Sequence, residues 1–139
     1  MTRSPIKRTG NLKSRSTTER STLEKQADRL IQEASRLMFQ GKCFKCHCEG
    51  NAGHHLVTRR NKDLRHRLMN IVYVCDSCHR FAEQHETQFM NYVKSSWPVI
   101  YTWHLEHKNL PPERVTCDDL RTTTEELKQF IQTMKERRG

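Results

Sequence analysis

Hydrophobic residues recur at helical spacing in the first third of the chain. They stand three or four positions apart, which is the period of one face of an amphipathic helix. The positions are Leu23, Ala27, Leu30, Ile31, Ala34, Leu37 and Met38. Ser21 and Glu24 have the spacing of a capping box before this stripe, and Gly41 follows it as a helix-ending residue. The pattern therefore predicts an amphipathic helix over 22–40, inside an N-terminal unit of residues 17–41.

The rest of the chain predicts short strands and further helices. The β-branched and aromatic run NIVYVC, residues 70–75, favours a strand, and residues 56–58 give a weaker strand signal. Helical spacing returns in three later segments, which are 79–97, 101–108 and 123–134. Proline-containing stretches separate these segments, as is typical of helix boundaries. Helices around a few short strands predict an α+β fold, and the sequence contains no internal repeat.

The composition limits how much stability can come from burial. Only 34% of the 139 residues are hydrophobic, and the mean hydropathy is −0.92, so we expect one modest domain with a thin core. No apolar run is long enough to cross a bilayer, and the N-terminus lacks an apolar signal core. We therefore expect a cytoplasmic protein with no membrane partner, in which paired cysteines bind metal rather than form disulfides.

The charge predicts a polyanionic partner. The formal net charge is +9, and the basic residues are clustered, which favours nucleic acid over an anionic surface. Residues 1–16 hold five lysines and arginines, no acidic residue and no periodicity. They predict a disordered basic arm that adds salt-dependent attraction to phosphates, with a plain solvated tail as the alternative.

Two CxxC pairs predict a structural zinc site. The four cysteines are Cys43, Cys46, Cys75 and Cys78. Two such pairs commonly hold a tetrahedral Zn²⁺, whose filled shell leaves no position for a reacting water, so this metal would hold the fold and do no chemistry. Cys48 or His47 in place of one member of the first pair is the alternative. Cys117 lies far away in sequence and is predicted to be an ordinary thiol.

A second candidate site lies among polar residues framed by the cysteines. Its members are His54, His55, Asn70, His79 and Glu83. His79 and Glu83 are four residues apart and share one helix face. Neighbouring strand residues point to opposite faces, so His54 and His55 would share a site only if the chain bends, which Gly53 permits.

The remaining histidines have weaker claims to a site. His85 would lie about 120° around the helix from the His79 face, so Glu83 is the better candidate for an additional ligand. His66, His104 and His107 have no constellation around them in the sequence. Surface or structural roles are expected for these four.

The pattern C-x2-C … HH-x3-RR … N-x4-C-x2-CH, over roughly residues 42–95, resembles the HNH endonuclease family. In particular it is similar to the zinc-knuckle HNH proteins of phages and bacteria. The resemblance implies a zinc-stabilised ββα-metal core over 42–97, flanked by the N-terminal helix and by a C-terminal helical extension over 98–139.

The resemblance also implies a role for each residue of the second site. His54 and His79 would bind one catalytic metal, and His55 would be the general base that takes a proton from water. Asn70 would tie down the loop that carries the base. Many relatives have a further histidine where this chain has Glu83, and a carboxylate there favours Mg²⁺ or Mn²⁺.

The expected function is that of a metal-dependent DNA endonuclease or nickase acting on duplex or branched DNA, and the resemblance implies 5′-phosphate and 3′-hydroxyl products. Phosphate contacts are expected from Arg59, Arg60, Arg65 and Arg67, with Arg60 and Arg65 favoured. One alternative is a non-catalytic zinc-knuckle DNA-binding protein. Another is an adaptor whose outer helices dock onto a protein partner, a second copy of the chain or a larger nucleic-acid machine.

Overall fold

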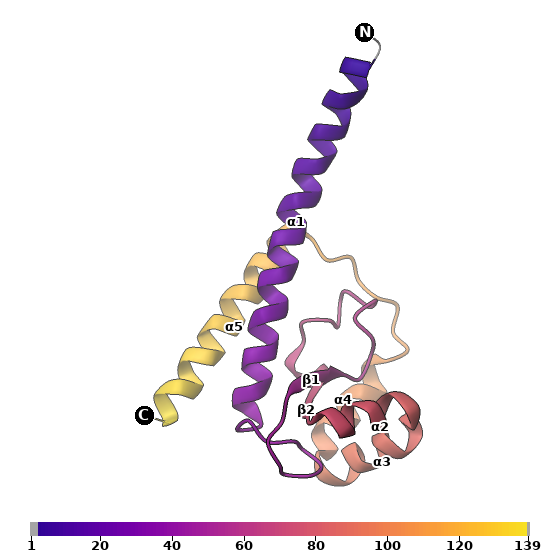
Figure 1. Ribbon diagram of the computed structural model, residues 1–139, viewed down its shortest axis with the longest axis vertical. Helices are drawn as coiled ribbons and strands as arrows, with labels where there is room; N and C mark the ends of the chain where they lie inside the picture. Colours follow the sequence, from indigo (N-terminus) through magenta and orange to yellow (C-terminus); the bar gives the residue numbers. More distant parts are fainter. Residues whose placement is uncertain (1–2, 139) are drawn as a thin grey trace.

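A small antiparallel sheet lies between two long helices and a group of shorter ones (Figure 1). The computed structural model describes the backbone of residues 3–138 and the side chains of residues 18–137. In chain order the elements are α1 (Arg3–Met38), β1 (Ala52–His55), the 3-10 turn η1 (Leu68–Asn70), β2 (Ile71–Val74), α2 (Asp76–Gln84), α3 (Glu86–Ser96), α4 (Pro98–His107) and α5 (Cys117–Arg138). The described residues thus form an α+β fold, as predicted. From Arg3 on, the backbone of the segment predicted as a disordered basic arm, residues 1–16, belongs to α1, and its side chains lie outside the described part.

The sheet is covered on both faces. Its register pairs Ala52 with Val74, Gly53 with Tyr73, His54 with Val72 and His55 with Ile71. Ile71 packs into a cluster shared with α1 and α5, whereas Val72 and Val74 pack into the cluster shared with α2, α3 and α4. A strand covered on both faces needs a continuous run of hydrophobic residues. This explains why the run in 70–75 is confirmed as β2.

The first strand lies earlier than predicted. Residues 56–58 are not a strand; β1 is Ala52–His55. The Leu56 N–H still donates to the carbonyl of Asn70, at 2.8 Å, but the Asn70 side chain then binds both backbone groups of Val57. The sheet therefore ends at this point because a side chain takes over the backbone hydrogen bonds of the next residue.

Three helix boundaries also differ from the prediction. The helix expected over 79–97 is interrupted at His85, whose φ of −135° and ψ of 61° separate α2 from α3. α1 continues through Ser21, so Ser21 and Glu24 do not begin a helix. α5 begins at Cys117 rather than near Thr123, because Thr116 and Asp119 form the capping box: each side-chain oxygen accepts the other's backbone N–H.

The two long helices form the layer behind the sheet. α1 and α5 run side by side in the same direction, although the whole core separates them in sequence (Figure 1). Ile31, Ala34 and Leu37 of α1 meet Leu127 and Ile131 of α5. None of the helices within residues 3–138 combines the length and hydrophobicity that a membrane span requires.

Gly53 allows α1 to approach the open edge of β1. The Gly53 N–H donates to Gln32 Oε1 at 2.8 Å, and Gln32 Nε2 donates to the Gly53 carbonyl at 3.2 Å. A Cβ at Gly53 would lie 2.6 Å from Ile71 Cγ2. The same Cβ would lie 3.3 Å from Gln32 Nε2, so the absence of a side chain at residue 53 helps the Gln32 amide to pair closely with this edge of the strand.

Substituting Gly53→Ala is expected to destabilise the fold by about 1–3 kcal/mol, the usual cost of overpacking. Urea unfolding followed by circular dichroism measures this change. In an Ile71→Ala background Gly53→Ala should destabilise the fold less, because the methyl group that clashes with the new Cβ is gone. A double-mutant cycle measures the free energy of this interaction. An unchanged penalty in that background would show that the contact with Ile71 is not its cause.

Candidate metal centre and histidine cleft

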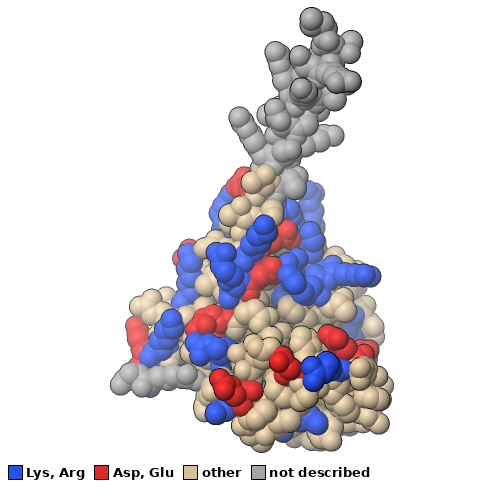
Figure 2. Space-filling view, in the orientation of Figure 1, with Lys and Arg blue, Asp and Glu red and all other residues tan. Residues whose placement is uncertain are grey.

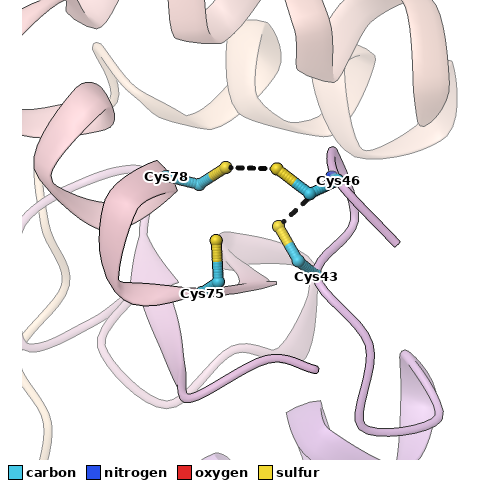
Figure 3. A group of neighbouring side chains, drawn as sticks. All are labelled: Cys43, Cys46, Cys75 and Cys78. Atoms are coloured by element: carbon cyan, nitrogen blue, oxygen red, sulfur yellow. Dashed lines mark hydrogen bonds between the residues drawn. The ribbon is translucent and has the colours of Figure 1, made fainter. Parts of the chain in front are cut away.

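Four cysteine sulfurs converge at one end of the sheet (Figure 3). The Sγ atoms of Cys43, Cys46, Cys75 and Cys78 all lie within 4.8 Å of one another. The Sγ atoms of Cys46 and Cys78 are 3.1 Å apart. A tetrahedral Zn²⁺ with Zn–S bonds of about 2.3 Å sets its sulfurs about 3.8 Å apart. These four cysteines could therefore hold a structural zinc ion.

Local backbone structure places each pair. The Cys46 N–H points at Cys43 Sγ, at 3.4 Å, and the left-handed conformation of His47, with φ 61°, closes the turn. Cys75 follows β2 directly and is the N-cap of α2, where N–H groups favour a thiolate. The Ser77 hydroxyl and the Cys78 N–H lower the pKa of Cys75 to about 6.

Cys78 shows why the cluster suits a cation. Burial and the neighbouring sulfurs raise the pKa of this thiol, since several adjacent thiols cannot all ionise without a compensating positive charge. A bound Zn²⁺ supplies that charge. Neither alternative ligand, His47 or Cys48, belongs to the group of four whose ligand atoms converge, although Cys48 lies beside Cys75. Cys117 begins α5, away from the cluster.

The adjacent histidines lie on opposite faces of a regular strand. His54 faces α2 and α3, with its ring centroid 5.0 Å from that of His79 and 5.3 Å from that of Phe89. His55 faces the other way, and its Nε2 lies 2.9 Å from the carbonyl oxygen of Arg65. The predicted bend at Gly53 is therefore absent from β1, which pairs regularly along its length.

Both histidines nevertheless line one cleft. This cleft has a volume of about 610 Å³ and extends from Asp28 and Gln32 of α1, past β1, to His79 and Glu83 of α2. Among the described residues β1 pairs with β2 alone, so its other edge faces the cleft. Residues from both faces of a strand can reach a space that lies along its edge, which removes the need for a bend.

Both histidines are held in the neutral form. Burial, with smaller contributions from His79 and His55, lowers the pKa of His54 to about 4. Burial also lowers the pKa of His55, although the hydrogen bond to the Arg65 carbonyl opposes the shift. A carbonyl can only accept, so Nε2 of His55 carries the proton and Nδ1 keeps its lone pair. His54 can therefore act as a ligand and His55 as a base.

His79 and Glu83 are neighbours on α2, as their spacing predicts. His79 Nε2 and Glu83 Oε1 are 3.5 Å apart, and the Glu83 side chain is 65% exposed. The cleft brings them together with His54, but their ligand atoms lie farther apart than the four cysteine sulfurs do. Within residues 18–137 the four cysteines, with ligand atoms within 4.8 Å of one another, are the one group of three or more His, Cys, Asp or Glu side chains placed closely enough to hold a metal ion. A catalytic metal at His54, His79 and Glu83 stays a prediction.

Asn70 is buried and fixes the loop that follows His55. Its side chain is fully inaccessible to solvent. Oδ1 accepts the N–H of Val57 at 2.8 Å, and Nδ2 donates to the carbonyls of Val57 and Leu64 at 3.0 and 3.1 Å. One amide thus joins the start of the loop to its later part, close to where the His55 ring is anchored.

The four predicted arginines have different surroundings. Arg65 is only 15% exposed and is paired with Asp28 of α1, whereas Arg59 is 59% exposed and reaches the same carboxylate. Arg67 pairs with Asp63. Arg60 is exposed on the cleft, and no hydrogen bond or ion pair to it is found within residues 18–137. Arg60 is therefore the most available cation beside the histidines, and Arg65 is engaged within the fold.

The other histidines have structural surroundings. His66 is buried against Asp28, with Nε2 to Oδ1 at 2.7 Å. His104 is buried, and the His107 ring stacks on Trp103. His85 stands at the junction of α2 and α3, where it is exposed.

Asp28 and Gln32 were not predicted from the sequence. Both stand on the polar side of the α1 stripe, four residues apart, and both line the cleft. Their spacing shows that they share a helix face, but nothing in the sequence indicates which segment that face meets.

In comparisons with protein-family models, with curated proteins and with solved structures, nothing matches this chain. The resemblance to HNH endonucleases therefore rests on the motif residues alone.

Proposed function

We propose that the chain is a metal-dependent DNA endonuclease or nickase of the ββα-metal (HNH) type. The observation that supports this best is the setting of His55. Its ring is neutral, anchored through Nε2 on the Arg65 carbonyl, and borders the cleft that also contains His54 and His79. β1, β2 and α2 follow one another in the order that the name of this fold describes.

His55 has the properties of a general base for phosphodiester hydrolysis. The attacking water must lose a proton, and a neutral imidazole with one nitrogen anchored offers the other to accept it. Such a base contributes typically about 10²–10⁴-fold in rate. Asn70 supports the same geometry from behind, because it fixes the loop whose carbonyl holds the ring.

The donor set beside His55 fits a divalent cation. Neutral His54 offers a ring nitrogen, the His79 ring offers another, and Glu83 offers a carboxylate oxygen near His79. A mixed nitrogen and oxygen set with a carboxylate suits Mn²⁺ or Mg²⁺ better than a third imidazole would. When bound, the ion would stabilise the charge that develops on the phosphate and the leaving oxygen.

The surroundings of the cleft suit a phosphate backbone. Arg59 and Arg60 line it, and lysines and arginines gather over α1 and the adjoining loop (Figure 2). The chain as a whole carries a net charge of +9. Arginine side chains position a duplex through its phosphates without reading bases, so the proposed substrate is DNA, duplex or branched, without an assigned sequence.

The test is a nicking assay on supercoiled plasmid with Mg²⁺, Mn²⁺ or EDTA. We expect metal-dependent nicking by the wild-type chain, and a loss of about 10²–10⁴-fold in rate in His55→Ala. His107→Ala is the matched control, because this ring stacks on Trp103 outside the cleft, and it should nick like wild type.

Two results would contradict the proposal. Undiminished nicking by His55→Ala would remove this residue from the base role. Retained DNA binding without nicking by the wild-type chain, with either metal, would instead favour a non-catalytic zinc-knuckle DNA-binding protein.

A further inference from the structure

We propose that Asp28 of α1 is a positioning residue for His55, acting through Arg65. This inference deepens the proposed function and rests on it. Asp28 lies outside the segment 42–95 that carries the motif, so the inference assigns α1 a part in the site.

Two consecutive contacts join the helix to the ring. The Arg65 guanidinium donates through Nε to Asp28 Oδ1 at 2.9 Å and through Nη2 to Oδ2 at 2.6 Å. The backbone carbonyl of the same Arg65 lies 2.9 Å from His55 Nε2. Arg65, whose side chain is bound by Asp28, is therefore the residue whose carbonyl orients the His55 imidazole.

The ion pair between Asp28 and Arg65 has a specific geometry. A bidentate pair between arginine and a carboxylate fixes direction as well as distance. Arg65 is mostly buried, with 15% of its side chain exposed, and Asp28 Oδ1 also accepts a hydrogen bond from the buried His66. Both carboxylate oxygens are thus in use. Glu24, one turn earlier on α1, lies 3.9 Å from Arg65 and 3.3 Å from Lys62, so the helix holds the loop at two levels.

The loop of residues 56–67 needs contacts from outside itself to fix the position of Arg65. Residues 56–67 contain no helix or strand, so regular backbone hydrogen bonding does not fix the Arg65 carbonyl. Asn70 fixes Val57 and Leu64 from inside the loop. Asp28 fixes the next residue, Arg65, from the opposite side. Without it, the residue whose carbonyl keeps the proton on Nε2 of His55 would lose its bidentate pair and keep only the longer, 3.9 Å ion pair with Glu24.

Asp28 remains ionised in this setting. Burial by itself raises the pKa of its carboxyl, but the hydrogen bonds from Arg65 and His66 outweigh burial, so the pKa lies below its usual value. The charged acceptor that a bidentate arginine requires is therefore present at neutral pH.

The first test is the kinetic effect of Asp28→Asn on plasmid nicking with Mn²⁺. The amide keeps one acceptor oxygen but turns a donor toward the guanidinium. We expect kcat to fall about tenfold, because small misplacements of a catalytic group cost one to two orders of magnitude, while KM for plasmid changes less than about twofold. The substitution frees Arg59 as well as Arg65, so weaker DNA binding is not expected.

Glu33→Gln is the matched control. It removes the same charge from the same helix, but Glu33 pairs with Arg36, and among residues 18–137 no hydrogen bond or ion pair joins it to the loop. If net charge or helix stability caused the loss, both variants would lose activity. The inference predicts a loss in Asp28→Asn only, and partial rescue by Asp28→Glu, which restores the carboxylate.

The second test measures the tautomer of the His55 imidazole directly and does not depend on nicking activity. Nitrogen-15 NMR of the zinc-loaded chain separates the two imidazole tautomers. We expect wild type and Glu33→Gln to show the Nε2–H form at His55, and Asp28→Asn to show a mixture. If Asp28→Asn fails to fold, Arg65→Lys serves in both tests, because it keeps the charge and loses the paired donors.

The outcomes separate the two proposals. A folded Asp28→Asn or Arg65→Lys chain with unchanged kcat and a single His55 tautomer overturns the role of Asp28. Absence of nicking by the wild-type chain rejects the nuclease, while the NMR comparison still decides whether Asp28 controls the ring.

Discussion

Removing the metal from the four-cysteine site is expected to unfold the sheet together with α2, α3 and α4. Cys43 and Cys78 are themselves members of the buried cluster that Val72 and Val74 join. Structural zinc sites contribute apparent free energies of about 10–16 kcal/mol, whereas whole domains are stable by only about 5–15 kcal/mol. A chain with 34% hydrophobic residues has little other burial to replace that contribution.

The measurement is metal content and circular dichroism before and after treatment with a strong chelator, in the presence of a reductant. One zinc per chain and loss of helical signal on chelation are expected. Cys78→Ser should lose both zinc and structure, whereas Cys117→Ser, outside the cluster, should keep both. Cys48→Ser should also retain zinc, because Cys48 is not one of the four ligands. A native spectrum after complete zinc removal would refute the structural role.

Substituting Asn70→Ala is expected to cost about 3–5 kcal/mol of stability and to abolish nicking. The side chain makes three hydrogen bonds in a fully buried position. Its removal leaves the N–H and the carbonyl of Val57 without these partners, while the Leu64 carbonyl keeps the Arg67 N–H at 3.1 Å. Each unsatisfied buried group costs about 1–3 kcal/mol. The loop that orients His55 would loosen even in the molecules that remain folded, so activity should fall further than stability alone requires.

Urea unfolding and the plasmid assay measure the two effects. Asn91→Ala, at an exposed position of α3, is the control and should behave like wild type. Asn70→Asp keeps the acceptor for Val57 but turns a carboxylate oxygen toward two carbonyls, so it should also be destabilised. Stability of Asn70→Ala within about 0.5 kcal/mol of wild type, the range of ordinary surface changes, would show that these hydrogen bonds do not hold the loop.

The features that were predicted from the sequence are those that short segments determine. β2 is a continuous hydrophobic run, and such a run fits a strand covered on both faces. The four cysteines come together as predicted, and within each CxxC pair the two cysteines are neighbours because the pair lies in a local turn, one of them at the N-terminus of α2. The four-residue spacing of His79 and Glu83 likewise puts them side by side on one helix.

What the sequence could not show depends on contacts between distant segments. The position of β1 depends on Asn70 taking the backbone groups of Val57, and no pattern within residues 52–58 reveals that side chain. In the sequence Arg65 resembles a surface cation, and only the packing of α1 against the loop pairs it with Asp28. The shared cleft of His54 and His55 depends on which edge of β1 stays open, which is a property of the assembled sheet.

The parallel course of α1 and α5 has a consequence for synthesis of the chain. α1 is translated before α5, so Ile31 and Leu37 find their partners Leu127 and Ile131 only after the whole intervening core has been translated. Contacts this distant in sequence form slowly, and until then the apolar stripe of α1 is exposed to other proteins. Asp28, which we propose holds His55 in place through Arg65, is on that same helix, so we expect the proposed site to be fully ordered only after α5 has packed on α1.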